Sequence, residues 1–294
     1  MDRASLESFM LIAELHSFSR AAEQQHITQP AISKRIANLE SILGTRLLTR
    51  HKRQIQLTHS GQVFLHHARA LIEQMNDCQT AVQNTRQKIA GKLKLGVSHH
   101  IGLHRLPDFL KMFTDAFPDV QLQLRFINSE AAIGMIQTAE LEIALTTLAE
   151  KPPATIYQQT VWQDPLHFVV SGSHALTAIN DRKKLTLEML CGHPAILPDK
   201  ESHTGQIIHR LFRQHDLTIN HFTETNNLET IRMMTSIGLG WTVLPRTMLN
   251  RQLQGLILEN KTPGLKRQLG YVHHKSRILS NTAQAFLHTL TNHY

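Results

Sequence analysis

Five polar side chains along one short stretch of the chain could bond to the edges of DNA bases. They are spaced along a single predicted helix and are Gln29, Ser33, Lys34, Arg35 and Asn38. Gln and Asn can bond bidentately to adenine, Arg and Lys to guanine or phosphate, and Ser to either. The helix is predicted to run from Gln29 to about Leu43. Thr28 can cap its start, Pro30 fits its first turn, and Gly44 can end it.

A shorter helix is predicted just upstream, from about Arg20 to Gln25, with a tight connection at His26–Thr28. Apolar residues recur at helical spacing across the two helices and predict a shared core. They are Ala21, Ala22, Ala31, Ile32, Ile36, Leu39, Ile42 and Leu43. A further helix, from Ser5 to about Leu15 with Ser5 as its cap, would pack beneath them. This arrangement is the helix-turn-helix pattern, and the alternative is an ordinary helical pair in a core.

A short basic turn, Arg50–Arg53, follows the helices. Residues on either side of it, Arg46–Leu48 and Gln54–Leu57, predict two short strands. A basic hairpin beside a recognition helix suits the phosphate backbone or the adjacent minor groove, whereas the alternative is a solvated charged turn.

Charge and composition favour a polyanionic partner. The chain has 294 residues, enough for two or three domains, and a net charge of +8. Residues 41–72 contain no Asp or Glu, unlike an ordinary mixed surface. The two cysteines, Cys78 and Cys191, suggest neither a disulfide framework nor a zinc site. No signal peptide and no apolar run of ~20 residues is found, so we expect a soluble, cytoplasmic protein with no membrane partner.

A long helix is predicted from about residue 59 to residue 90. Its apolar residues alternate in steps of four and three, with Thr85 as the one polar member, which is a heptad seam. The apolar members are Phe64, Ala68, Leu71, Met75, Cys78, Val82 and Ile89. At ~1.5 Å per residue this helix would be ~45 Å long, too long for one small domain. We expect it to pair with its own copy, so that two recognition helices read an inverted repeat.

Residues 1–90 resemble the winged helix-turn-helix and linker helix of the LysR-type transcriptional regulators. The matching residues are Phe9, Ser17–Ser19, Ala21–Ala22, Thr28–Ser33, Ile36, Leu39–Glu40, Leu43–Gly44, Leu47–Leu48, Arg50, Leu57–Thr58 and Gly61. Two departures are Leu48, where the family usually has Phe, and Lys34–Arg35, where one position is commonly Gln. Lys34, Arg50, Lys52 and Arg53 are assigned to phosphates. The full set of candidate DNA-contacting residues is Ser19, Thr28, Gln29, Pro30, Ser33, Lys34, Arg35, Arg50, Lys52 and Arg53.

Strand and helix patterns alternate from residue 91 to residue 294, which predicts an α/β domain with a mainly parallel sheet. The resemblance implies the family's effector domain, a two-lobed fold like the periplasmic binding proteins. Lobe I would comprise about 92–161 and 268–294, and lobe II about 162–267. The preceding parts would be an all-α winged helix-turn-helix over 1–58 and a dimerisation helix over 59–90.

Polar residues follow four predicted strands, where ligands of open α/β sheets bind. These candidates are Ser98, His99, His100, Thr146, Thr147, Ser202, His203, Thr204 and Asn226. Hydroxyls, imidazoles and a helix N-terminus suit a small anion such as a carboxylate. A metal site built on His99–His100, His203 and His221 is the alternative, although the 20 histidines are scattered through the chain.

These patterns predict a DNA-binding transcription regulator, not an enzyme, controlled by a small anionic effector and needing no other cofactor. The resemblance implies a dimer or tetramer, and RNA polymerase as a partner if the protein is an activator. Two alternatives remain: a C-terminal domain that only oligomerises, and an enzyme domain fused to a DNA-binding domain. No dinucleotide fingerprint, P-loop, G-x-S-x-G or H-E-x-x-H motif supports the enzyme.

Overall fold

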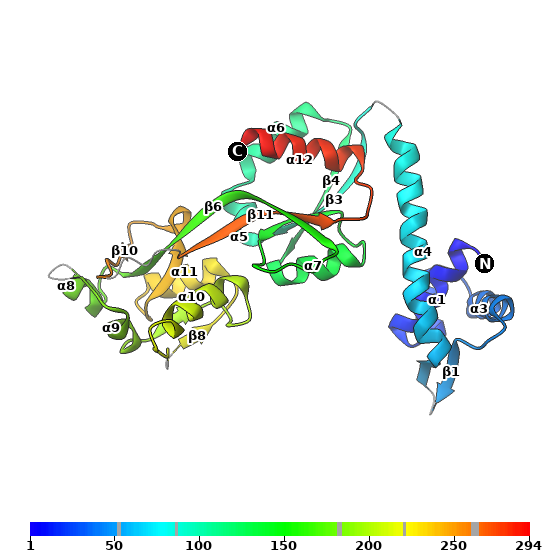
Figure 1. Ribbon diagram of the computed structural model, residues 1–294, viewed down its shortest axis with the longest axis horizontal. Helices are drawn as coiled ribbons and strands as arrows, with labels where there is room; N and C mark the ends of the chain where they lie inside the picture. Colours follow the sequence, from blue (N-terminus) through cyan, green and yellow to red (C-terminus); the bar gives the residue numbers. More distant parts are fainter. Residues whose placement is uncertain (52–53, 86–87, 181–183, 220–221, 260–264) are drawn as a thin grey trace. The chain divides into compact units, whose positions relative to one another are not determined.

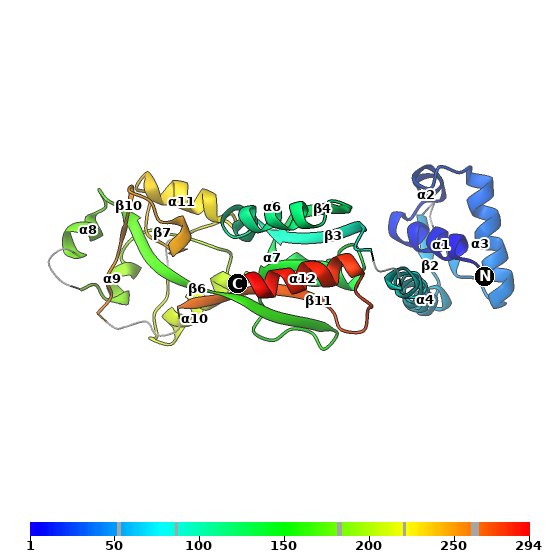
Figure 2. The ribbon, with the colours of Figure 1, turned by 90° about the horizontal axis from the view of Figure 1, so that it is seen from above.

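The computed structural model describes residues 1–51, 54–85, 88–180, 184–219, 222–259 and 265–294. The chain divides into two compact units, Met1–Arg86 and Gln87–Tyr294, which are drawn in Figures 1 and 2. Each unit is described by itself below.

The N-terminal unit is a three-helix core followed by a two-stranded hairpin and a long helix. Its elements are α1 (Arg3–Leu15), α2 (Phe18–Gln24), α3 (Gln29–Leu43), β1 (Leu48–His51), β2 (Gln54–Leu57) and α4 (His59–Asn84). Thr28 Oγ1 accepts a hydrogen bond from Ala31 N, and Gly44 ends α3 with a φ of 65°. The predicted limits of α3 are therefore confirmed. Helix α1 begins earlier than predicted, because Asp2 rather than Ser5 caps it.

The core of this unit lies between α1, α2, α3 and the start of α4. Its fully or nearly fully buried members include Phe9, Ile12, Ala21, Ile32, Leu39 and Ala68. The prediction that Ala31, Ile42 and Leu43 belong to this core is wrong. Ala31 and Leu43 are exposed, and Ile42 is 58% exposed.

The C-terminal unit contains two lobes joined by two long strands, β6 (Ile156–Ser171) and β11 (Lys266–His274). Figure 1 shows these strands running from one lobe into the other. The other elements of lobe I are β3 (Gly91–Ser98), α5 (His99–His104), α6 (Pro107–Ala116), β4 (Val120–Ile127), α7 (Ser129–Gln137), β5 (Ile143–Thr147) and α12 (Asn281–His293). Those of lobe II are α8 (Ala175–Asn180), α9 (Leu187–Cys191), β7 (Ala195–Leu197), α10 (His203–Arg213), β8 (Phe222–Glu224), α11 (Leu228–Ser236), β9 (Thr242–Pro245), the 3-10 helix η1 (Arg246–Met248) and β10 (Leu253–Gly255).

Helices cover both faces of the sheet in each lobe (Figures 1 and 2). In lobe I, Ile143 and Leu145 of β5 pack with α6 and α12, whereas Ala144 between them packs with α7. Lobe II repeats the pattern on β6, where Phe168 packs with α10 and Val169 packs with α11. This alternation is the period of two that a strand buried on both faces requires.

The sheet is mixed, so the expectation of a mainly parallel sheet is wrong. Strands β3, β4 and β5 are parallel, as are β7 and β8, whereas β6 and β11 run antiparallel to their neighbours. Two local predictions also fail. The sequence pattern predicts a loop at Ser98–Gly102, but helix α5 follows Ser98 directly. It also predicts two strands, Ile156–Trp162 and Leu166–Val170, but the structure has the single strand β6.

Candidate functional site

One face of α3 carries polar side chains that are free of the core. Gln29, Pro30, Lys34 and Asn38 are exposed along this helix. Thr28 and Ser19, at the starts of α3 and α2, are also exposed, and Ser33 is half-buried. The candidate base-reading residues therefore lie on an accessible or partly accessible surface.

Arg35, which was also expected at the base edges, is half-buried and bonds to residues outside α3. Its Nη1 donates to Ser8 Oγ at 3.2 Å and to Gln25 Oε1 at 3.1 Å. Ser8 is completely buried and donates in turn to the carbonyl of Ala4. Arg35 thus connects α3 with α1 and with the end of α2.

The hairpin is fixed to the end of α3 by one carboxylate. Glu40 Oε1 accepts from Leu47 N at 2.7 Å and from Leu48 N at 3.1 Å. The backbone of Arg50 lies in β1, as predicted for a wing, but nothing is described of its side chain. Lys52 and Arg53 lie outside the described residues.

The predicted heptad seam of α4 divides into two halves with different surroundings. Phe64, Ala68 and Leu71 pack on the N-terminal core, and the rings of Phe64 and Phe9 are 5.2 Å apart. Met75 and Val82 are 41% and 65% exposed, and Cys78 is also exposed. Ile89 is not in the helix, which ends at Asn84, and packs instead on the core of lobe I. Its assignment to the seam is wrong.

A cavity of about 90 Å³ lies between the two lobes of the C-terminal unit. The first residues of α7, α10 and α11 line it, with the end of β3. Of the predicted effector residues, the ones that line this cavity are Ser98, His99, His100, Thr147, Ser202, Thr204 and Asn226. Helix N-termini carry unpaired N–H groups and a partial positive charge, so their convergence favours an anion.

Two other predicted effector residues lie just outside this cavity. Thr146 is in β5 and is 2% exposed. His203 lines a neighbouring cavity of about 440 Å³, and its Nδ1 lies 3.1 Å from the carbonyl oxygen of Thr147. The rule that ligands bind beyond strand ends therefore located the cavity. It did not show which of the neighbouring residues at each strand end line it.

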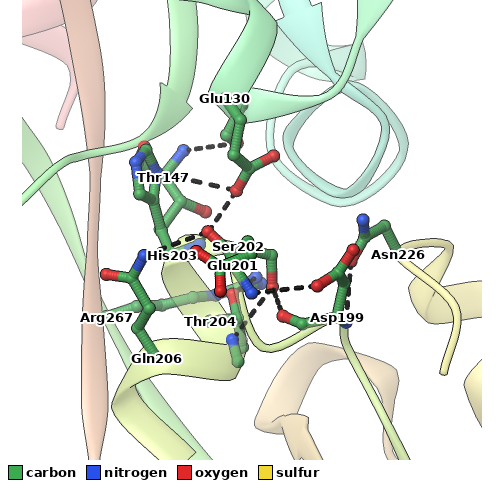
Figure 3. A network of polar contacts seen from close by, with 12 residues as sticks. Glu130, Thr147, Asp199, Glu201, Ser202, His203, Thr204, Gln206, Asn226 and Arg267 are labelled. Carbon is green, nitrogen blue, oxygen red and sulfur yellow. Dashed lines mark hydrogen bonds and ion pairs between the residues drawn. The ribbon is translucent and has the colours of Figure 1, made fainter.

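The cavity also contains a buried charged group that the prediction missed. Arg267 of β11 is 4% exposed, and its Nε donates to Asp164 Oδ2 at 2.8 Å. Its Nη1 donates to Thr204 Oγ1 at 3.3 Å (Figure 3). Its Nη2 is buried and has no hydrogen-bond partner among the described residues. Asp164 also accepts from Arg105 Nη2 at 3.0 Å. Two guanidinium groups therefore share one carboxylate, so these three residues together carry one surplus positive charge.

His100 is uncharged beside this group. Its side chain is 5% exposed, and Nε2 is 3.6 Å from Asp164 Oδ2, too far for a hydrogen bond. Burial, followed by the positive charge of Arg267, lowers the pKa of His100 from 6.5 to about 2. Both ring nitrogens are buried without a partner, so this ring can still offer a donor or an acceptor to a ligand.

Polar contacts besides that between His203 and Thr147 join the lobes around the two cavities. His104 of α5 lies 2.7 Å from the carboxylate of Glu229 at the start of α11. Glu130 of α7 accepts from the backbone N–H of His203 at 2.9 Å (Figure 3). Arg210 of α10 makes a bidentate ion pair with Glu150. The lobes are thus held by β6, β11 and contacts that a ligand could exchange.

Two negative observations bear on other functions. Among the described residues, no three His, Cys, Asp or Glu side chains are grouped so that they could hold a metal ion. His221, part of the metal alternative, lies outside the described residues. No described helix is long and apolar enough to cross a membrane.

Comparison with known proteins matches each of the two units to a family model. Residues 4–62 match the model for bacterial regulatory helix-turn-helix proteins of the lysR family, and residues 86–294 match the LysR substrate binding domain. An uncharacterized HTH-type transcriptional regulator of Bacillus subtilis, YybE, is 27% identical over 294 residues, covering 100% of this chain and 99% of the relative.

Solved structures have the same fold. Full-length OxyR from Pseudomonas aeruginosa, a variant, superposes with a TM-score of 0.72 at 21% identity, covering 99% of this chain and 94% of that one. Full-length CbnR in complex with its target DNA gives a TM-score of 0.64 at 18% identity, covering 100% of both chains. The chain belongs to the LysR family of DNA-binding transcriptional regulators, in which an N-terminal helix-turn-helix precedes an effector-binding domain.

Proposed function

We propose that this regulator binds an inverted-repeat DNA site as a dimer or tetramer and responds to a small anionic effector held between its lobes. Gln29, Pro30 and Ser33 approach base edges, while Lys34 contacts phosphate. Ser19, Thr28, Arg50, Lys52 and Arg53 complete the DNA-facing set. The exposed face of α3 and the solved complex of CbnR with its DNA support this assignment.

The exposed half of the α4 seam supports pairing of two chains. Met75, Cys78 and Val82 form an apolar stripe that no described residue of the N-terminal core covers. Pairing along this stripe would place two recognition helices on one DNA site.

Exposed apolar side chains on both lobes support a second pairing, between C-terminal units. On lobe I they are Leu103, Leu124 and Phe126, and on lobe II they are Met233, Ile237 and Leu239. Two kinds of pairing together would make a tetramer.

The buried and unpartnered Nη2 of Arg267 carries the effector assignment. A donor of this kind, 4% exposed beside a helix N-terminus, gains a hydrogen bond and a counter-charge when an anion binds. Thr204 and Ser98 line the same cavity as Arg267 and can offer a backbone N–H and a hydroxyl. A small carboxylate or oxyanion can use all three groups.

The effector would act by preferring one arrangement of the lobes. Because the cavity is lined by residues of both lobes, an anion there has different contacts in a closed and in an opened domain. Only such a difference in affinity can shift the balance between two states of the regulator.

The test is Ser98→Ala, with Ser236→Ala as its control. Ser236 is a surface serine of α11 whose hydroxyl bonds to its own helix, at Met233 O. A panel of small acids is screened by thermal shift, and affinity for the best one is measured. Loss of a hydrogen bond to a charged ligand, worth ~1.5–3 kcal/mol, should weaken binding by S98A roughly 10- to 150-fold. DNA affinity without the acid should not change.

Failure of every acid to stabilise the wild type would favour a C-terminal domain that only oligomerises. Equal affinity of S98A and S236A would exclude Ser98 from the site. Turnover of any acid in the screen would instead support an enzyme.

A further inference from the structure

The start of α10, in lobe II, is occupied by a carboxylate from lobe I. Glu130 is in the first turn of α7, and its Oε1 accepts from His203 N at 2.9 Å. The same oxygen lies 3.8 Å from His203 Nδ1. Figure 3 shows this carboxylate reaching the first turn of α10, close to Ser202. It is placed where a helix N-terminus binds an anion.

Glu130 differs from the other acid in the cavity lining. Glu229 is paired with His104 and with Arg232, at 2.7 and 2.6 Å. Glu130 makes no ion pair with a Lys or Arg of the described part of the chain, and its partner is His203. Its position is therefore held by the helix N-terminus rather than by a cation.

Few donors of α10 remain for a ligand while Glu130 is in place. Ser202 Oγ accepts from Gly205 N at 3.0 Å, and Glu130 accepts from His203 N. Among the first-turn amides, this leaves Thr204 N. An anion bound to Thr204 N and Arg267 would lie next to the Glu130 carboxylate, and like charges at such a separation disfavour each other.

We propose that Glu130 is a tethered carboxylate that competes with the effector for the N-terminus of α10. In the ligand-free protein it joins lobe I to lobe II. An effector that brings its own carboxylate displaces it and releases this contact. The inference rests on the proposed anion site and adds how that site is regulated.

Tethering makes Glu130 a strong competitor although it forms few bonds. A group held on the same chain acts at an effective concentration in the millimolar range or above. The effector binds only the fraction of molecules in which the α10 N-terminus is free, so its apparent affinity is reduced by that fraction. Removing the charge of Glu130 should therefore raise the affinity for a carboxylate.

The test compares Glu130→Gln, Glu130→Asp and Glu229→Gln in the full-length protein. Gln keeps the size and an acceptor oxygen but loses the charge, and Asp keeps the charge on a shorter side chain that draws the carboxylate back from α10. Glu229→Gln makes the same charge change in the same cavity without touching α10. Sodium acetate and sodium sulfate are titrated at constant ionic strength, and binding is read from the thermal midpoint.

Both Glu130 variants should bind the probes about tenfold more tightly than wild type, and E229Q less than threefold. The amide of His203 should also exchange its hydrogen faster in E130Q, and acetate should slow it again. Equal or weaker binding by E130Q, with wild type still stabilised by the probes, would overturn the competitor alone. No stabilisation of any variant by either probe would refute the anion site itself, and the competitor with it.

Discussion

Arg35→Ala tests whether this side chain holds the recognition helix or reads DNA. The guanidinium donates to Ser8 Oγ and Gln25 Oε1, each on a different helix of the core. Hydrogen bonds to a charged group contribute ~1.5–3 kcal/mol. Ser8 and Gln25 remain bonded to each other at 2.7 Å, so the variant leaves neither without a partner. We therefore expect a loss of about 1.5–3 kcal/mol in the stability of the three-helix core.

The assay must isolate that core, because a chain of two units need not unfold in one step. Hydrogen exchange of the amides of α1, α2 and α3 reports the local free energy of opening. Binding to a randomised DNA library reports base preference in the same protein. In R35A the core amides should lose protection, and affinity should fall for all sequences alike.

Lys34→Ala is the matched control, since Lys34 is the neighbouring cation and is exposed. A surface change of this kind should alter stability by less than ~0.5 kcal/mol. Loss of one phosphate contact should reduce the dependence of log affinity on log salt by about 1. Unchanged protection in R35A, with altered preference at a single base pair, would refute the inward role of Arg35.

Two further predictions concern the other unit and the pairing helix. Met75→Asp, in the exposed half of the α4 seam, should give monomers in sedimentation experiments. The control Gln74→Asp, at the neighbouring position, should not. Intact dimers of M75D would exclude this stripe from the interface. Because the folded-state pKa of His100 is lowered to about 2, the unfolded chain binds one more proton between about pH 2 and 6.5. The stability of the C-terminal unit should therefore be fully present above pH 6.5 and fall by up to ~1.4 kcal/mol per pH unit below it. Urea titrations of wild type and His100→Gln measure this slope, and an equal slope in both would show that His100 does not cause it.

Local chemistry explains which predictions of the N-terminal unit succeeded. Thr28 and Gly44 limit α3 because a cap hydroxyl and a left-handed residue act within one turn. The role of Arg35 could not be predicted in this way, since its partners Ser8 and Gln25 belong to other helices. The heptad seam was visible, but no spacing rule separates the half that packs on its own core from the exposed half.

Strand β6 shows a different limit of the sequence. Pro165 has no N–H and lies between the two strands expected at Ile156–Trp162 and Leu166–Val170. In the structure it lies where β6 changes partners: Pro165 is opposite Lys266 of β11, and Leu166 is opposite Pro245 of β9. The strand continues through Pro165 because β6 pairs with β11 up to the proline and with β9 after it. Because two strands were predicted in place of β6, Asp164 lay between them and its pairing with Arg267 was not predicted.

The place of Asp164 and Arg267 explains why a small ligand could affect the whole C-terminal unit. They are directly opposite each other on β6 and β11, the strands that join the lobes. A buried ion pair contributes little to stability that well-packed apolar residues would not, because desolvation offsets the attraction between the charges. Stability alone therefore does not account for charges at this position. The proposed function gives these charges a role: an anion bound to Arg267 would change the charge balance between the two strands that join the lobes.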